Sequence, residues 1–193
     1  MTVHKLSVGD NAPSFELKAI DGRQINLDDY AGRYVLVAFL RYAGCPWCNL
    51  AVHRLAVEQP LLADNGCEII TFIQSQPESI QANIMDRHKL IPKFPIIADP
   101  EMAVYGEFGV RPSVFGGLKH AISNLPSWLQ SVYKEGYAQT SVDGNLFLAP
   151  ATFLISPNDQ KIIRIDRESD LYDHASFTKL YDAIADHGIH GIT

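Results

Sequence analysis

The sequence predicts an α/β fold in which a central mixed sheet carries helices on both faces. Three observations predict it. Continuous apolar runs at 34–40 and 68–73 have the length and composition of strands that are covered on both sides. Segments with helical spacing of apolar residues follow these runs, so strand and helix alternate along the chain. A strand–turn–strand pattern over 151–166 then adds antiparallel strands before a last helix.

Local signals predict the elements of the first half. Alternating residues at 14–19, an Asp-Gly turn and a return at 24–27 predict an N-terminal β-hairpin. Pro46 suits the first turn of a helix that apolar spacing extends to residue 59, and Pro60 is expected to kink or end that helix. The other expected elements are a helical turn at 28–32, a last helical turn at 61–63, a helix at 77–89 with Ser75 as its N-cap, a strand at 94–98 and a helix at 101–108.

Residues 111–142 interrupt the alternation of strands and helices. Helical patterns at 114–120 and 125–133 lie within this stretch. We expect a helical insertion on one domain that spans 1–193, because 193 residues fit a single domain at roughly 150 residues each. Two roles are open for the insertion: a cover over the functional site, or a face of a homodimer. Strands at 151–156 and 161–166 and a helix at 176–186 complete the expected domain.

Composition and charge exclude several classes of function. The 16 Lys and Arg against 22 Asp and Glu leave a formal net charge of −6, so a nucleic-acid partner is not expected. No apolar run reaches the ~18 residues of a membrane helix. The polar stretch at 1–11 lacks the apolar core of a secretory signal, and we therefore expect a cytoplasmic protein. Three cysteines in a reducing compartment favour a catalytic or metal-binding role over a disulfide scaffold.

Cys45-Pro46-Trp47-Cys48 is the main chemical signal. It lies where the apolar strand ends and the next helix begins, and a helix N-terminus stabilises a thiolate through its free N–H groups and its dipole. Cys45 is expected to be the exposed nucleophile. Cys48, one helical turn later, is placed to attack a mixed disulfide or a sulfenic acid on Cys45. The pattern predicts a redox-active disulfide centre.

Other interpretations of the cysteines are weaker. A zinc site needs a second pair of ligands, and the chain has no second Cys-x-x-Cys. Cys67, at the start of a predicted strand, is expected to be a small buried residue. No metal or other cofactor is therefore expected, although two helix-terminal thiolates shared between chains also fit a non-enzymatic iron–sulfur protein. A fold that serves only as an interaction module is the remaining alternative.

Two stretches of the chain carry a family resemblance. The opening residues resemble those of peroxiredoxins and related thioredoxin-fold proteins: Gly9, Asp10, Ala12, Pro13, Phe15, Leu17, Asp21, Gly22, Leu27, Gly32 and the apolar strand to Phe39. The stretch from Phe39 to Cys48 resembles the peroxiredoxin-like branch of the alkyl hydroperoxide reductase/thiol-specific antioxidant family. The resemblance covers nearly the whole chain and implies a thioredoxin-like fold and antioxidant thiol chemistry. It also implies that Pro150 is a cis-proline beside the active cysteines, where it exposes backbone groups to a bound disulfide or peptide.

The chain departs from the peroxiredoxin pattern at two places. Typical peroxiredoxins have Pro-x-x-x-Thr-x-x-Cys, and this chain has Ala38 and Tyr42 at the Pro and Thr positions. An arginine at the head of the late strand is replaced by Ala149-Pro150-Ala151. Arg41 and Tyr42 carry a charge and a hydroxyl that partly replace the missing groups. Disulfide exchange needs neither group, so the departures favour it over fast peroxide reduction.

Together these observations predict a thiol-disulfide oxidoreductase with Cys45 as nucleophile and Cys48 as resolving thiol. The alternative is a hydroperoxide reductase with Cys45 as the peroxidatic cysteine. Arg41, Tyr42, Trp47 and Pro150 are the expected substrate-binding residues, because Trp47 lies between the cysteines and an aromatic ring there can dock a substrate. The resemblance implies a hydroperoxide or a disulfide as substrate and a thioredoxin-, glutaredoxin- or glutathione-type reductant.

Overall fold

A five-stranded mixed sheet forms the centre of the molecule. The computed structural model describes residues 5–87, 91–113, 125–134, 136–167 and 174–190. The strand order is β5-β4-β3-β6-β7, in which β3, β4 and β5 run parallel and β6 and β7 run antiparallel to their neighbours. The strands are β3 Tyr34–Leu40, β4 Cys67–Ile73, β5 Ile96–Ala98, β6 Ala151–Ile155 and β7 Ile162–Arg167. The predicted α/β class with a mixed sheet is confirmed.

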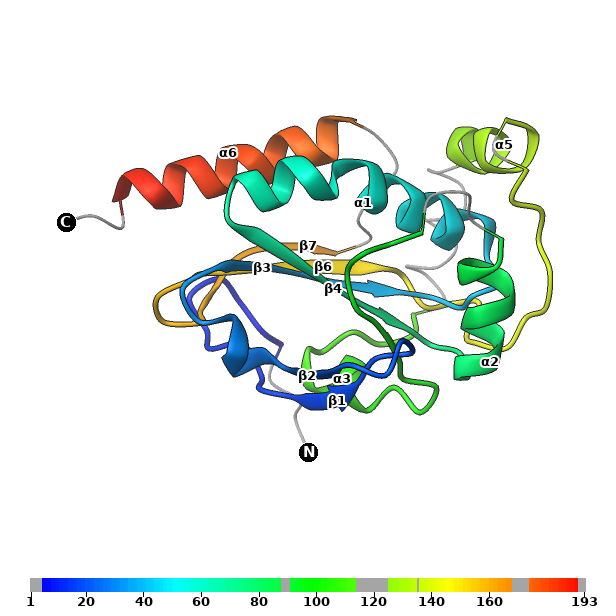
Figure 1. Ribbon diagram of the computed structural model, residues 1–193, viewed down its shortest axis with the longest axis horizontal. Coiled ribbons are helices and arrows are strands. Elements are labelled where there is room, and N and C mark those ends of the chain that lie inside the picture. The colour runs from blue at the N-terminus through cyan, green and yellow to red at the C-terminus, as the bar shows by residue number, and fades with distance from the viewer. Residues whose placement is uncertain (1–4, 88–90, 114–124, 135, 168–173, 191–193) are drawn as a thin grey trace.

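Helices cover both faces of this sheet (Figure 1). One face packs against α1 (Pro46–Asp64) and α6 (His174–His190). The other packs against α3 (Ala103–Glu107) and against the segment that contains the β-hairpin. The remaining elements are the hairpin strands β1 (Glu16–Lys18) and β2 (Gln24–Asn26), the 3-10 helix η1 (Leu27–Tyr30), α2 (Pro77–Ile80), the π-helical turn η2 (Gln81–Met85) and α5 (Leu125–Tyr133).

The apolar run of β3 supplies side chains to two separate cores. Leu36, Ala38 and Leu40 belong to the core under α1 and α6. Val35, Val37 and Phe39 point the opposite way, as alternation along a strand requires, and belong to the core under α3. Both sets are buried, which explains why the sequence shows a continuous apolar run rather than an alternating one.

Two expectations about the helices are wrong in their details. Helix α1 is not one of them: it continues through Pro60 to Asp64, which confirms the last turn expected at 61–63. The helix expected at 77–89 is only one α-helical turn, continued by the π-helical turn η2, and 88–90 lie outside the described residues. The C-terminal helix is longer than the expected 176–186. The helix expected at 114–120 also lies outside the described residues.

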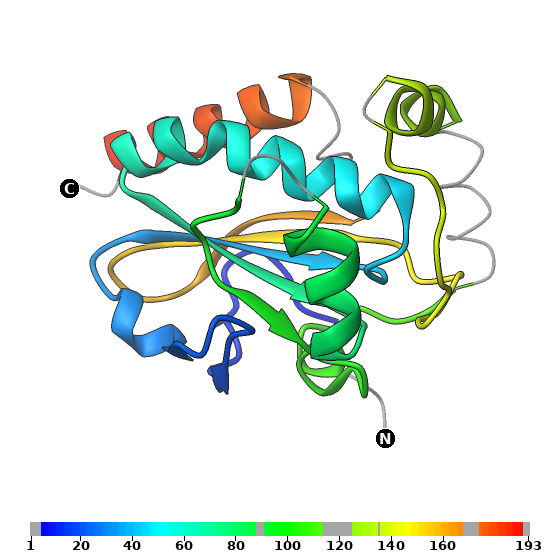
Figure 2. The same cartoon turned by 45° about the vertical axis from the view of Figure 1, so that its right-hand side comes forward.

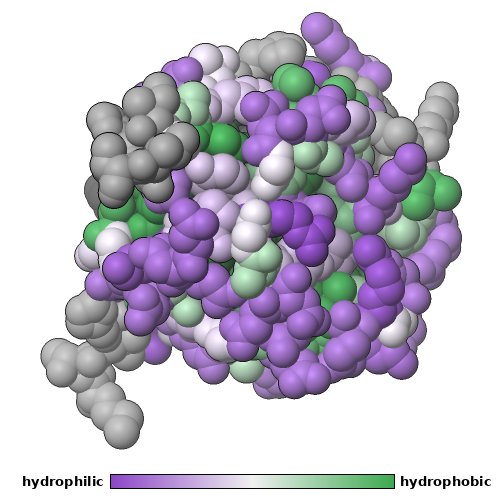
Figure 3. Space-filling view, turned by 60° about the vertical axis from the view of Figure 1, so that its left-hand side comes forward, coloured by the Kyte–Doolittle hydropathy of each residue, from purple (hydrophilic) through white to green (hydrophobic). Residues whose placement is uncertain are grey.

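The surface is mostly polar on the face shown in Figure 3, where hydrophobic side chains occur in small separate groups. Scattered apolar side chains of this kind are ordinary on a folded domain. Among the helices that the structure describes, none is long and apolar enough to cross a bilayer.

Candidate active site

The Cys-x-x-Cys pair lies at the junction of β3 and α1. The strand ends at Leu40, and the helix begins at Pro46, whose missing N–H is not needed in the first helical turn. Cys45 is the N-cap residue, with extended backbone angles (φ −77°, ψ 125°). Cys48 lies within the first helical turn. The positive end of the helix dipole therefore acts on the Cys45 sulfur.

Arg41 places a positive charge against the Cys45 sulfur. Its Nη2 donates a hydrogen bond to Sγ over 2.9 Å, and both side chains are buried. Burial alone raises the pKa of the Cys45 thiol. The hydrogen bond from the Cys48 thiol, the charge of Arg41 and the Cys48 amide outweigh burial and lower this pKa to about 6. At neutral pH Cys45 is therefore mainly a thiolate, the nucleophilic form.

Cys48 has the opposite electrostatic environment. Burial raises the pKa of its thiol well above the ordinary value, and the hydrogen bond to Cys45 and the charge on that sulfur raise it further. Cys48 therefore keeps its proton at neutral pH. The pair is asymmetric: the Cys45 thiol is mainly ionised at neutral pH, and the Cys48 thiol is protonated.

Two aromatic side chains of the motif region enclose the Arg41 guanidinium. Its carbon lies 5.0 Å from the ring centroid of Trp47 and 5.6 Å from that of Tyr42. Its Nη1 donates to the carbonyl oxygen of Leu146 over 3.1 Å. A buried guanidinium is costly unless its charge and its donors are satisfied, and the thiolate, the carbonyl and the two rings meet that need. The structure thus brings Arg41, Tyr42 and Trp47 together around Cys45.

Two buried polar side chains outside the motif hold the loop that carries Cys45. Asn49 Nδ2 donates to the carbonyl oxygens of Ala43 and Cys45 over 2.7 and 3.0 Å. Ser75 Oγ accepts a hydrogen bond from the Ala43 N–H over 2.9 Å. Ser75 was expected to cap the helix at 77, which is wrong: Gln76 is the N-cap residue, and the Ser75 hydroxyl is used by the loop instead.

Sequence reasoning missed both of these supporting residues. The available signal for Asn49 is an amide placed one turn into a helix whose neighbouring positions are small or apolar. The signal for Ser75 is its place just after β4, since the carboxyl ends of the parallel strands β3 and β4 meet at one edge of the sheet.

Cys45 is not exposed, contrary to the expectation for a nucleophile: none of its surface is accessible. An extended segment, residues 138–146, lies against the loop that carries it, and we call this segment the strap. Figures 1 and 2 show it within the yellow-green to yellow trace that passes from α5 beside α2 toward β6. The Thr140 N–H donates to the carbonyl oxygen of Gly44 over 3.2 Å. The strap thus contacts the residue directly before Cys45.

Pro150 differs from the expectation that came with the family resemblance. All peptide bonds among the described residues are trans, including the one that precedes Pro150, so the expected cis-proline is wrong. Its ring is buried. It lines a cavity of about 260 Å³ together with Val110, Pro112 and Arg167. Two residues before it, Leu148 forms an isolated antiparallel bridge with Pro112.

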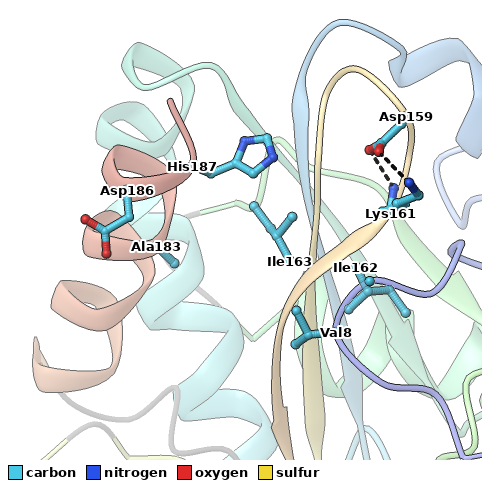
Figure 4. A pocket seen from close by; sticks show the side chains of 9 residues that line it. Val8, Asp159, Lys161, Ile162, Ile163, Ala183, Asp186 and His187 are labelled. Carbon is cyan, nitrogen blue, oxygen red and sulfur yellow. Dashed lines mark hydrogen bonds and ion pairs between the residues drawn. The ribbon is translucent and has the colours of Figure 1, made fainter. Parts of the chain in front are cut away.

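A second cavity, of about 490 Å³, lies between α6 and β7 (Figure 4). Its lining includes Ile163 from β7 and His187 from α6. His187 Nδ1 lies 3.1 Å from the hydroxyl of Tyr34, the first residue of β3, whereas Cys45 follows the last residue of that strand. A seven-residue strand spans roughly 23 Å, so this cavity is separate from the cysteine pair.

The third cysteine, Cys67, is a buried thiol that stays protonated at neutral pH. It is buried at the start of β4, as expected, and burial raises its pKa to about 12. Among the residues that the structure describes, no three His, Cys, Asp or Glu side chains gather as a set of metal ligands.

Comparison with known proteins agrees with this arrangement. The model of the AhpC/TSA family matches residues 8–165. Peroxiredoxin Bcp of Escherichia coli (strain K12) is 31% identical over 108 residues, which are 56% of this chain and 67% of that protein. Thiol-disulfide oxidoreductase ResA of Bacillus thuringiensis is 28% identical over 110 residues, 56% of this chain and 61% of that one.

The fold is also found among solved structures. The crystal structure of peroxidoxin BcpB from Mycobacterium tuberculosis superposes with a TM-score of 0.66 at 15% identity, covering 95% of this chain and 98% of the other. A thioredoxin-like fold with an asymmetric dithiol at the start of α1 agrees with the family match over most of the chain. The chain therefore belongs to the AhpC/TSA family and is a thiol oxidoreductase.

Proposed function

We propose that Cys45 is the attacking nucleophile of this oxidoreductase and that Cys48 is the resolving thiol. The observation that carries the proposal is the 2.9 Å contact between Arg41 Nη2 and Cys45 Sγ, together with the opposite pKa shifts of the two thiols. A nucleophile must be ionised before it reacts, and its resolving partner must not compete with it for the oxidant.

Reduction of a disulfide is the first candidate reaction. The Cys45 thiolate attacks one sulfur of the substrate, forms a mixed disulfide and releases the other sulfur as a thiolate. Cys48 then attacks the Cys45 sulfur, and the second substrate thiol leaves with the Cys48 proton. The protein ends with a Cys45–Cys48 disulfide, and the substrate gains the two electrons. The spacing of one helical turn supports this reaction, and a relative is a thiol-disulfide oxidoreductase.

Reduction of a hydroperoxide is the second candidate, and Arg41 is the specific observation in its favour. Its guanidinium supplies the positive charge that the sequence lacks at the head of β6. The Cys45 thiolate attacks the terminal peroxide oxygen, the O–O bond breaks, and the alcohol leaves after taking up a proton. Cys48 condenses with the resulting sulfenic acid and releases water. In either reaction an external thiol reductant restores the dithiol.

The test uses the fully reduced protein and mass spectrometry after rapid quenching. With hydrogen peroxide or glutathione disulfide, the wild-type protein should form the Cys45–Cys48 disulfide. In Cys48→Ser the first product should accumulate on Cys45, as a sulfenic acid with peroxide or as a mixed disulfide with glutathione. Cys67→Ser is the matched control and should behave as wild type. First modification of Cys48 or Cys67, or reaction in Cys45→Ser at the wild-type rate, would contradict the proposed roles.

A further inference from the structure

We propose that the strap, residues 138–146, determines which oxidants reach Cys45 by excluding bulky ones while it is in place. This inference rests on the proposed role of Cys45 as the nucleophile, and it adds a specificity element that lies outside the cysteine motif. None of the Cys45 surface is accessible with the strap in contact with the loop, so an oxidant needs part of this cover to move, and a bulky oxidant needs a larger opening.

Two glycines show how closely the strap and the loop approach each other. A β-carbon on Gly44 of the loop would lie 2.2 Å from the Ser141 carbonyl oxygen of the strap. A β-carbon on Gly144 of the strap would lie 2.7 Å from the Tyr42 Cβ and 2.8 Å from the Gln74 carbonyl oxygen. Neither distance leaves room for a side chain. The strap and the loop are therefore in backbone contact next to the nucleophile.

Hydrogen bonds fix the strap at several points along its length. Thr140 donates from its N–H to the Gly44 carbonyl oxygen over 3.2 Å and from Oγ1 to Asn83 Oδ1 over 2.6 Å. The Asn145 N–H donates to Gln74 Oε1 over 2.8 Å. The Leu146 carbonyl oxygen accepts from Arg41, the residue that also contacts the Cys45 sulfur. The strap is thus joined to the same guanidinium that stabilises the thiolate.

Two more hydrogen bonds hold the first residues of the strap, from Arg87 to the Ala138 carbonyl oxygen over 3.0 Å and from the Tyr42 hydroxyl to Gln139 Oε1 over 3.3 Å, but no strap residue is fully buried. Strap residues 138–143 are exposed, and the segment is neither helix nor strand. A segment with few buried contacts and solvent-accessible hydrogen bonds opens locally at low cost compared with global unfolding. The strap is therefore a removable cover, whereas the core below it is not.

Hydroperoxides and disulfides need different amounts of space beside Cys45, and therefore different openings of the strap. Attack on a hydroperoxide requires only its terminal oxygen to approach Cys45 Sγ. Attack on a disulfide requires three sulfur atoms nearly in line, with a substituent on each of the outer two. A disulfide therefore needs more space beside the Gly44–Ser141 contact than a hydroperoxide does. We expect both kinds of oxidant to require opening of the strap, a small hydroperoxide a slight opening and a disulfide a wide one.

The experiment compares the access of small and large thiol reagents to Cys45. Reduced Cys67→Ser protein is treated with iodoacetamide or with a maleimide attached to a large polyethylene glycol, and modification of Cys45 is followed by peptide mass spectrometry. Gly144→Ala should displace the strap and raise the rate with the large reagent about tenfold or more, with a smaller change for iodoacetamide. Gly106→Ala is the matched control, because nothing lies within 4 Å of its added β-carbon.

A second variant guards against a folding defect in Gly144→Ala. Thr140→Val keeps the shape of an exposed side chain and removes its hydrogen bond to Asn83, and it should raise the large-reagent rate about fivefold, the factor for one net hydrogen bond. Thr178→Val, an exposed threonine on α6, is its control. If the large maleimide reagent modified Cys45 at the same rate in the wild type and in both strap variants, the proposed role of the strap would be wrong.

The same variants separate this inference from the proposed function. In stopped-flow oxidation, both strap variants should gain more in rate with glutathione disulfide than with hydrogen peroxide. An unchanged ratio of the two rates would also overturn the inference. If the large reagent reaches Cys45 faster in the strap variants but no oxidant yields the Cys45–Cys48 disulfide, the role of the strap is supported and the proposed function is wrong.

Discussion

At the scale of single residues, Arg41 contacts several parts of the site at once. It touches the sulfur of Cys45, the carbonyl oxygen of the strap at Leu146 and the rings of Tyr42 and Trp47. One buried side chain thus contacts both the Cys45 sulfur and the strap. Its place four residues before Cys45 is visible in the sequence, but its direction is not, because a residue at the end of a strand can turn either toward the helix or toward solvent.

Removal of the Arg41 charge should make Cys45 less acidic. The pKa of about 6 predicts that the rate of Cys45 alkylation by iodoacetamide rises with pH through a midpoint near 6 and then levels off. In Arg41→Gln the midpoint should move toward the ordinary thiol value of about 8.5. Arg33→Gln, which changes an exposed arginine paired with Glu68, should keep the wild-type midpoint. An unchanged midpoint in Arg41→Gln would show that the charge does not govern the thiolate.

Tyr105 is a buried residue whose hydroxyl bonds the ends of two strands. This fully buried phenol donates to the carbonyl oxygens of Leu40 and Phe72, at the carboxyl ends of β3 and β4. Tyr105→Phe leaves these acceptors without that donor in a dry environment, so the free energy of unfolding should fall by about 1–3 kcal/mol. Urea denaturation of this variant and of Tyr133→Phe, whose side chain is 79% exposed, provides the comparison. Equal stabilities would mean that the two carbonyls do not depend on the phenol.

At the scale of elements, the parts that could be predicted are those whose signal is local. β3 has the predicted bounds because seven apolar residues in a row suit only a strand covered on both faces. Pro60 does not end α1, because Leu62 in the last turn expected at 61–63 is buried in the core. Ser75 was misjudged because a serine before a proline suits an N-cap, and only the fold shows that Ala43 lies beside it.

The short helix α3 depends on a residue that precedes it. Asp99 accepts hydrogen bonds from the N–H groups of Ala103 and Val104, each over 2.9 Å. Its carboxylate thus satisfies free donors of the first turn, and its negative charge faces the positive end of the helix. Asp99→Ala should lower the free energy of unfolding by about 1–2 kcal/mol in thermal or urea denaturation. Asp182→Ala, an exposed carboxylate within α6, should change it far less, and the same loss in both variants would contradict the capping role.

At the scale of the whole molecule, the sheet separates two cores that share its strands. The sequence predicts the separation, because buried strands between two layers of helices must present apolar residues on both faces. It does not predict the strap, because residues 138–146 carry no periodic pattern and their position depends on contacts far away in the chain. The cysteine pair was therefore predictable from the sequence, and the burial of Cys45 was not. The cis bond expected at Pro150 came from the family resemblance, and the trans bond found there is the ordinary state of a peptide bond before proline.

The two cores should respond to mutation independently even where their residues are neighbours in sequence. Ile69 belongs to the core under α1 and α6, and Ile70 to the core under α3. Each Ile→Val change should cost about 0.5–1.5 kcal/mol. Since their side chains share no packing partners, the double variant should lose the sum of the two within about 0.5 kcal/mol.

A double-mutant cycle at two positions of the same core provides the comparison, because its interaction energy should not be zero. Val37 lies opposite Ile70 in the parallel register, and both belong to the core under α3. Val37→Ala and Ile70→Val enlarge the same region, so neighbouring side chains can relax into a shared space and the two losses should not add. Urea denaturation of the four proteins in each cycle measures both interaction energies. A coupling between Ile69 and Ile70 as large as that between Val37 and Ile70 would mean that the sheet transmits packing changes from one core to the other.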